Sequence, residues 1–202
     1  MTTERAITLH DWEVRAVLNG ATQIRRVIKP QPQSAEAPHG WIDLEWWTWK
    51  TDVLQSTTAL TDNLITAAPF QPGQRLWCKE TWADIPETFP GNVHYKAAAT
   101  QADLEWFKQE GWHWLSPVVM PRDFSRLTLE VTSTGAGRVQ DVTEDEAVAA
   151  GFVADPHMEF PDRLLFTARD KFLNAWDEYY ADRGFPTWTN PWRYSYGLRR
   201  TA

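Results

Sequence analysis

The chain has 202 residues, of which 43% are hydrophobic, and a formal net charge of −7. This length suits one domain with a buried core. The acidic balance indicates no broad basic surface for duplex nucleic acid, but it allows a small positive pocket for one nucleotide or a short strand end. The single cysteine excludes an internal disulfide and favours a reducing compartment. No segment resembles a signal peptide or a membrane span, so we expect a soluble cytoplasmic protein.

The first thirty residues predict a strand, a helix and a second strand. Ile7 to Leu9 indicates a short strand, and Asp11 is placed to cap a helix with apolar residues at helical spacing that ends at Gly20. Ile24 to Ile28 predicts the next strand, which two prolines end.

Two adjacent arginines in this second strand are the best clue to a site. Successive residues of a strand point to opposite faces, so one of Arg25 and Arg26 should point inward or line a groove. A guanidinium keeps its charge there and needs an acidic partner or a polar ligand. The pair therefore suggests an anionic or hydrogen-bonding guest.

The remainder of the chain predicts several short strands and helices. Segment 33–70 is weakly patterned and is treated as a variable excursion, within which Trp41 to Trp49 indicates a strand or hairpin arm. The other expected elements are strands over 75–82, 93–97, 127–131 and 192–199, and helices over 103–110, 143–151 and 167–184. Together they predict a mixed α+β domain, plausibly a small barrel.

Metal, cofactor and nucleophile signatures are missing from the sequence. The five histidines are scattered without paired spacing: His10, His39, His94, His113 and His157. No P-loop, dinucleotide fingerprint or nucleophile elbow is present, and Cys78 in mid-strand predicts a buried, inert thiol. We therefore expect no metal and no cofactor.

Glu80 and Trp82 form a second candidate feature. Period-two alternation puts them on one face of a strand, with Lys79 on the other. Beside an inward arginine, Glu80 would accept a hydrogen bond from the exocyclic amine of a base or orient that arginine. The alternative is a plain Arg–Glu pair that supports the sheet.

Positive charge and aromatic rings accompany these residues. Arg122 and Arg126 precede the clearest strand, and together with the strand arginines and Lys29 they would line the rim of a pocket. There are 13 tryptophans, which either fill the core or provide stacking platforms for bases.

Four blocks in order resemble the ASCH domain family of the PUA-like superfamily, in the version common in bacteriophages and prophages. They are Gly20 to Pro32, Pro72 to Ala83, Met120 to Val131, and Asn190 to Trp192 with the closing Arg199 and Arg200. The resemblance covers nearly all of residues 1–202 as a single domain, with variable excursions at about 33–70 and about 84–115. It implies a small PUA-like β-barrel with flanking short helices and a cleft suited to RNA or a nucleoside.

The resemblance also implies several activities. Members of the family and its relatives include readers of modified bases. A bacterial branch hydrolyses acetylcytidine with a lysine, a threonine and a glutamate, and ribonuclease activity has been attributed to some members.

The residues of that amidohydrolase branch are missing here. The lysine position of the motif falls on Ala21, the second threonine on Ile24, and the glutamate on Ala150, while Thr22 and Arg26 remain. Alanine and isoleucine have no group that transfers protons. A one-residue slip of the alignment would make Glu144 or Glu146 the counterpart of the glutamate, but neither restores the lysine.

The main hypothesis is a binding module for RNA, single-stranded nucleic acid or a nucleotide, without the amidohydrolase chemistry. The residues expected in the cleft are Thr22, Arg25, Arg26, Lys29, Glu80, Trp82 and Arg122. The first alternative is a hydrolase of a modified nucleoside, or a ribonuclease, with Glu80 as general base. The second is a module for phage–host protein interaction that uses an exposed tryptophan patch.

Overall fold

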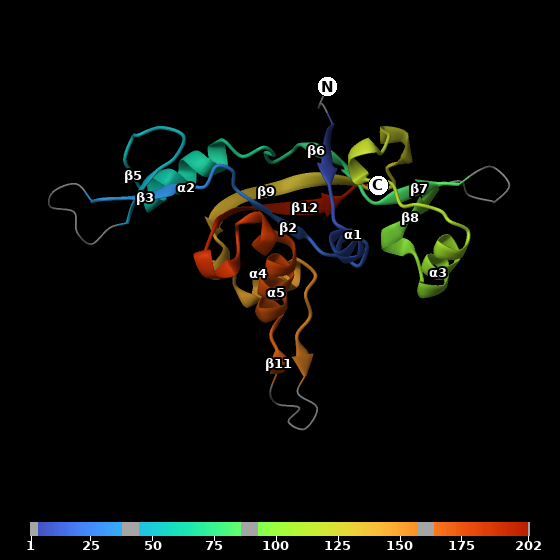
Figure 1. Cartoon of the computed structure of the whole chain (residues 1–202). Coiled ribbons are helices and arrows are strands. Elements are labelled where there is room, and N and C mark those ends of the chain that lie inside the picture. Colours follow the sequence, from blue (N-terminus) through green and yellow to red (C-terminus); the bar gives the residue numbers. More distant parts are fainter. Residues whose placement is uncertain (1–3, 38–44, 86–92, 157–163, 202) are drawn as a thin grey trace. The chain divides into compact units, whose positions relative to one another are not determined.

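The computed structural model describes residues 4–37, 45–85, 93–156 and 164–201 (Figure 1). The chain forms two compact units. Unit 1 consists of Met1–Thr22, Pro72–Thr132 and Leu198–Ala202, and unit 2 of Gln23–Gln71 and Ser133–Gly197.

Unit 1 is built on strands from three separate parts of the chain. Its elements are β1 (Arg5–Thr8), α1 (Asp11–Leu18), β6 (Arg75–Lys79), β7 (Trp82–Asp84), β8 (Val93–Tyr95), the 3-10 helix η1 (Lys96–Ala98), α3 (Gln101–Gln109), the 3-10 helices η2 (Pro117–Val119) and η3 (Arg122–Phe124), and the first part of β9 (Thr128–Arg138). β1 pairs parallel with β6, and β6 pairs antiparallel with β9, with Leu76 opposite Leu129. Both leucines and Cys78 are fully buried, so these strands supply the core of the unit.

An aromatic cluster occupies another part of unit 1. β7 and β8 form an antiparallel pair, and Ala83, Ile85 and Phe107 of α3 are buried together. Three half-buried tryptophans pack against this group: Trp106, Trp112 and Trp114.

Unit 2 contains the remaining strands and the second part of β9. Its elements are β2 (Gln23–Val27), β3 (Gln33–Ala35), β4 (Trp46–Thr48), β5 (Gln55–Ser56), α2 (Thr57–Thr66), the second part of β9, the 3-10 helix η4 (Val139–Asp141), α4 (Glu144–Ala149), β10 (Asp155–Pro156), β11 (Leu164–Phe166), α5 (Ala168–Tyr180), the 3-10 helices η5 (Ala181–Arg183) and η6 (Thr187–Thr189), and most of β12 (Trp192–Arg200). β12 lies between β9 and β2 and pairs antiparallel with β2.

Helices α4 and α5 cover one face of the β2–β12 pair, as Figure 1 shows. Their apolar side chains form a core with the 3-10 turn that follows β9. The buried members of this core are Val139, Val142, Ala147, Ala168, Phe172, Trp176 and Tyr180. Val27 of β2 packs against this core, so the helices are held on the face to which the odd-numbered residues of β2 point.

The mixed α+β class is confirmed, and the strands of the described residues do not close into a barrel. The strand order is β1-β6-β9 in unit 1 and β9-β12-β2 in unit 2. β1 and β2 each have one neighbour, so the order is that of an open sheet. β3, β4 and β5 form a separate sheet within the predicted 33–70 excursion, of which residues 38–44 lie outside the described part.

The structure confirms the predicted helices. Their ends could be predicted because they are set by residues close together in the sequence. The capping box of Thr143 and Glu146 opens α4, and Gly151 follows with a φ of 94°. Thr167 and Asp170 form the capping box of α5. The predicted strand over 75–82 is divided instead, because β6 ends at Lys79 and Trp82 pairs with Tyr95 of β8.

The longest helix among the described residues is α5, with 13 residues. No described helix combines the length and the apolar character needed to cross a membrane.

Candidate anion-binding site

Two arginines on neighbouring strands of unit 2 share one face. In the β2–β12 register, Arg25 lies opposite Ser195 and Arg193 lies opposite Val27. Residues two apart on a strand point to the same side, so the two guanidinium groups are diagonal neighbours. Their side chains are only 2% and 4% exposed. Sequence alternation predicted one inward arginine in the pair, and the structure identifies it as Arg25.

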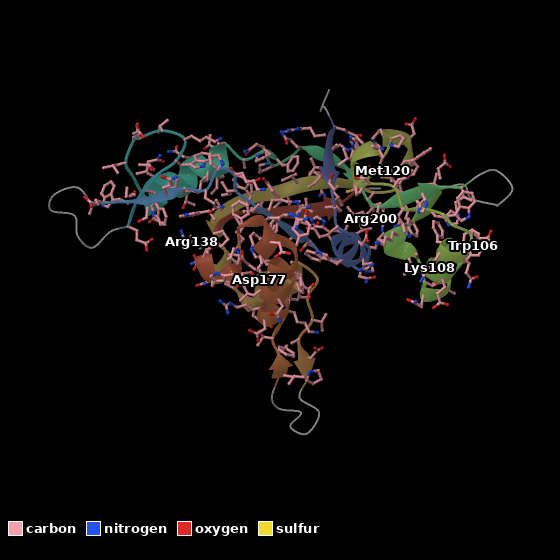
Figure 2. All side chains as sticks on the ribbon, in the orientation of Figure 1. Trp106, Lys108, Met120, Arg138, Asp177 and Arg200 are labelled. Atoms are coloured by element: carbon pink, nitrogen blue, oxygen red, sulfur yellow. The ribbon has the colours of Figure 1, made fainter. Side chains whose placement is uncertain are left out.

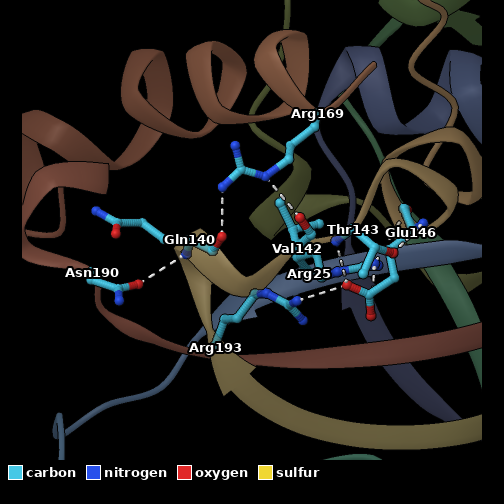
Figure 3. A network of polar contacts seen from close by, with 8 residues as sticks. All are labelled: Arg25, Gln140, Val142, Thr143, Glu146, Arg169, Asn190 and Arg193. Carbon is cyan, nitrogen blue, oxygen red and sulfur yellow. Dashed lines mark hydrogen bonds and ion pairs between the residues drawn. The ribbon is translucent and has the colours of Figure 1, made fainter. Parts of the chain in front are cut away.

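One carboxylate lies between these two arginines. Glu146 sits in the first turn of α4, where Thr143 caps the helix. Its Oε2 accepts a hydrogen bond from Arg193 Nη2 at 3.1 Å, and its Oε1 lies 3.6 Å from Arg25 Nη2 (Figure 3). Arg25 Nη2 also donates to the main-chain oxygen of Glu146 at 3.2 Å. The Glu146 carboxylate therefore contacts two buried guanidinium groups.

Several donors of this cluster have no acceptor. Arg25 Nε and Nη1 and Arg193 Nε are buried and make no hydrogen bond within the described part of the chain. A buried donor left unpaired costs about 1–3 kcal/mol, and more when it is charged. The cluster is therefore short of acceptor atoms.

Burial and mutual repulsion weaken proton binding in the cluster. Burial, followed by the charge of Arg193, lowers the pKa of Arg25 to about 10, while Glu146 acts in the opposite direction. Burial also lowers the pKa of Arg193, opposed by the charge and hydrogen bond of Glu146 and by the charge of Asp141. Arg25 stays protonated at neutral pH, because its pKa still lies well above 7.

The surrounding backbone is held by a second set of polar contacts. Arg169 donates from Nε to the main-chain oxygen of Val142 at 2.9 Å and from Nη2 to that of Gln140 at 2.6 Å (Figure 3). Asn190 Oδ1 accepts from the amide of Gln140. Glu144 accepts hydrogen bonds from the first two amides of α5. These contacts fix the loop and helix that present Glu146 to the arginines.

Glu80 forms an ion pair of its own within unit 1. It is fully buried after the end of β6, and its two oxygens accept hydrogen bonds from Arg126 Nε and Nη2 at 2.9 and 2.8 Å. The guanidinium of Arg126 lies 4.2 Å from the centre of the Tyr95 ring. Burial and the charge of Glu80 raise the pKa of Tyr95. A buried carboxylate with both oxygens bound to one arginine matches the supporting Arg–Glu pair better than a general base that faces a substrate.

The other predicted cleft residues of unit 1 are dispersed. Trp82 is buried against Phe124, with ring centres 5.2 Å apart. Arg122 is 42% exposed and pairs with Glu4 at 2.7 Å. The hydroxyl-bearing Thr22 is exposed, and its main-chain oxygen accepts from the amide of Leu198.

The remaining predicted residues of unit 2 lie near Arg25 in the chain but outside its cluster. Arg26 is half-buried and donates to the main-chain oxygen of Arg25 at 2.6 Å. Lys29 is exposed, with its ammonium 4.9 Å from the centre of the Phe185 ring. Of the predicted cleft, unit 2 contains Arg25, Arg26 and Lys29, and unit 1 contains the others.

The positions aligned with the amidohydrolase residues carry no reactive group. Ile24 and Ala150 are buried, and Ala21 is half-buried. Glu146, the counterpart after a one-residue slip, is engaged by both arginines and by the cap of α4.

Sequence reasoning missed Arg193 as a site residue. The strand over 192–199 was predicted, and Arg193 stands between the aromatic residues Trp192 and Tyr194. A charged residue between aromatic residues of a predicted buried strand is unusual, and this pattern could have indicated Arg193 as a site residue.

The described residues contain no group of three or more His, Cys, Asp and Glu side chains arranged to hold a metal ion. His39 and His157 lie outside the described residues. Cys78 is fully buried on β6, as predicted.

The comparisons with known proteins returned no similarity: no family model, no curated protein and no solved structure matches the chain. The resemblance to the ASCH family therefore stays a prediction from the quoted motifs.

Proposed function

We propose that this chain binds a nucleotide or the end of a single-stranded RNA, and that Arg25 and Arg193 recognise a phosphate group. The observation that carries the proposal is the buried pair of guanidinium groups that share the single carboxylate of Glu146. The cluster has unpaired guanidinium donors, which are the complement of an anion rich in acceptor oxygens.

The chemistry of arginine suits this role. A guanidinium presents its donors in a planar fork that matches phosphate oxygens, and such charge-assisted hydrogen bonds are stronger than neutral ones. Glu146 is 32% exposed, so the cluster borders solvent on the side of α4. An anion that displaced the Glu146 side chain would supply acceptors to the two guanidinium groups, whose unpaired atoms include the buried Arg25 Nε and Nη1.

The charge of the whole chain favours a small or local target. With a net charge of −7, long duplex nucleic acid would be repelled outside the arginine cluster. This supports a mononucleotide or a strand end over a duplex. We further propose that the fold is of the ASCH, PUA-like type, and that the amidohydrolase chemistry is lost with the residues replaced by Ala21, Ile24 and Ala150.

Calorimetric titration with cytidine, cytidine monophosphate and a short single-stranded RNA tests the proposal. We expect the phosphate-bearing ligands to bind and the nucleoside to bind much more weakly. Arg25→Gln should weaken the phosphate-bearing ligands about tenfold or more, because a charge-assisted hydrogen bond contributes about 1.5–3 kcal/mol. The affinity should fall with rising salt, as expected for phosphate contacts.

Arg199→Gln is the matched control, because it removes the same charge from a side chain of β12 that is 66% exposed. Equal affinity in Arg25→Gln and the unaltered chain would contradict the assignment. Conversion of acetylcytidine to cytidine by the purified chain would contradict the loss of catalysis.

A further inference from the structure

A polar pocket of about 280 Å³ lies in unit 2. Its lining comes from the segment that follows β2, from β3 and β4, and from the loop that joins β4 to β5. The volume is close to the lower end of the range typical of small-molecule sites. The pocket therefore has room for a small molecule.

Two side chains hold this pocket in shape. Gln31 donates from Nε2 to the main-chain oxygens of Ile28 and Trp192 at 2.7 and 2.9 Å, and its Oε1 accepts from the amide of Trp192 at 2.6 Å. Trp49 is buried, and its indole Nε1 donates to the main-chain oxygen of Pro30 at 2.9 Å. The polar atoms of these two side chains are bonded within the protein, so this part of the pocket is formed before a guest arrives.

Two side chains of opposite charge line the pocket and can reach a guest. Lys50 and Asp52 are both exposed, and neither makes a hydrogen bond or an ion pair within the described part of the chain. They are the charged residues of the described lining, so its formal charges cancel. The Lys50 ammonium lies 4.2 Å from the centre of the Trp49 ring, which positions the ammonium and leaves its three N–H donors unpaired.

Neutral polar groups surround these two charges. The amide of Gln33 and the hydroxyls of Thr48 and Thr51 also line the pocket, and they make no hydrogen bond with other described residues. Gln33 and Thr51 are exposed, and Thr48 is half-buried. Amide and hydroxyl groups both donate and accept, so the pocket offers further hydrogen bonds to a guest held by the charges.

The backbone at Lys50 is strained. Its φ is 58°, and among the described non-glycine residues only Asn190 shares a positive φ. Asparagine tolerates this left-handed region better than lysine does, and glycine adopts it without strain. The chain thus has a lysine where glycine suits the backbone better, which is typical of positions that serve a function.

We propose that this pocket binds a small zwitterion of the free amino-acid type, with the guest's anionic group on the Lys50 ammonium and its cationic group on the Asp52 carboxylate. A guest with a single charge would leave one of the two side chains unpaired and would be repelled by it. The proposal does not rest on phosphate recognition, because Arg25, Glu146 and Arg193 do not line the pocket.

Calorimetry and saturation-transfer NMR with charge-blocked ligands test the proposal. The zwitterionic probe is free L-glutamine. N-acetyl-L-glutamine keeps only the negative charge, and L-glutaminamide keeps only the positive charge. We expect the zwitterion to bind about fivefold more tightly than either derivative, which is the size expected for an exposed ion pair, and to bind more weakly as salt rises.

Two variants should each remove one part of this preference. Asp52→Asn should abolish the preference for the zwitterion over N-acetyl-L-glutamine, because the cationic group loses its partner. Lys50→Gly should abolish the preference over L-glutaminamide, and it should also raise the urea midpoint of unfolding because it relieves the strained φ. The matched controls are Asp62→Asn on α2 and Lys108→Gln on α3, the latter labelled in Figure 2, since both residues are exposed and do not line the pocket.

Unchanged circular dichroism in each variant shows that the fold is intact. The proposal is overturned if the zwitterion does not bind, if it binds no more tightly than the two derivatives, or if both variants bind it as the unaltered chain does. A lower urea midpoint in Lys50→Gly would mark Lys50 as a structural cover of Trp49 and would overturn its role as a binding residue. No probe contains a phosphate, so failure here does not bear on the arginine cluster.

Discussion

Replacement of Arg25 by methionine distinguishes a binding residue from a structural clamp. Arg25→Met removes one of the two buried positive charges and leaves Glu146 paired with Arg193 alone. Methionine is long and apolar enough to pack against Phe172, whose ring lies 5.9 Å from the Arg25 guanidinium. The variant therefore exchanges an incompletely paired charge for an apolar contact.

The size of the expected change in unfolding free energy follows from the lowered pKa of Arg25. Its fall from the ordinary value of an arginine to about 10 corresponds to about 3 kcal/mol by which the fold disfavours the charged guanidinium. Loss of the hydrogen bond to the Glu146 main-chain oxygen offsets about 1 kcal/mol of the gain. We expect Arg25→Met to raise the free energy of unfolding by about 2 kcal/mol at pH 7 while it abolishes phosphate binding.

The sign of the pH dependence is also determined. The unfolded chain holds the Arg25 proton more tightly than the folded chain does. The charged guanidinium therefore lowers the free energy of unfolding at every pH below about 10. The stability difference between the variant and the unaltered chain should therefore shrink as pH rises above 10, where folded Arg25 loses its proton.

Urea denaturation followed by circular dichroism measures these differences. Glu146→Gln is the companion variant, and it should destabilise the chain by about 3 kcal/mol because it removes the carboxylate that contacts both arginines. If Arg25→Met destabilises the chain by about 2 kcal/mol or more, Arg25 acts as a clamp on α4, and the argument for an anion site fails.

Two further predictions concern stability away from the site. Arg126→Ala should lower the free energy of unfolding by about 3–5 kcal/mol in urea denaturation, because it leaves the fully buried Glu80 carboxylate unpaired. Arg122→Ala, which breaks an exposed pair, should lower it by less than about 1 kcal/mol. Similar losses in the two variants would refute the distinction. Gly137→Ala on β9 should raise the unfolding free energy by about 0.4–1 kcal/mol, since nothing lies within 4 Å of the added carbon. At Gly135 the added carbon would lie 2.7 Å from the hydroxyl oxygen of Ser195 on β12, so Gly135→Ala should raise the free energy of unfolding by less than Gly137→Ala does. A larger increase for Gly135→Ala would contradict this close approach.

Helices α4 and α5 could be predicted because neighbouring residues set where they begin, whereas α2 in the weakly patterned segment 33–70 was not predicted. Thr143 and Glu146, and likewise Thr167 and Asp170, are three residues apart, so each capping box forms from local sequence alone. The strands were predicted less completely. β9 continues to Arg138 beyond the alternating segment 127–131, because pairing with neighbouring strands extends it through residues without an apolar pattern.

The hypothesis of one cleft around Arg25, Glu80 and Trp82 shows the limit of strand periodicity. Alternation correctly required an inward arginine in the β2 pair. It could not say that Glu80 pairs with Arg126, because these residues are far apart in sequence and meet only through the fold of unit 1. Nor could it divide the predicted residues between two compact units.

The sequence by itself determined the α+β class, the ends of the helices α4 and α5, and the buried cysteine, since each depends on residue identity or on short-range spacing. Only the tertiary structure decided that Arg25 is the inward arginine, that Arg193 joins it across the β2–β12 register, and that Glu146 lies between them. The reason is physical: whether buried charges balance depends on which distant side chains share one dry volume, and that follows from strand register and helix packing.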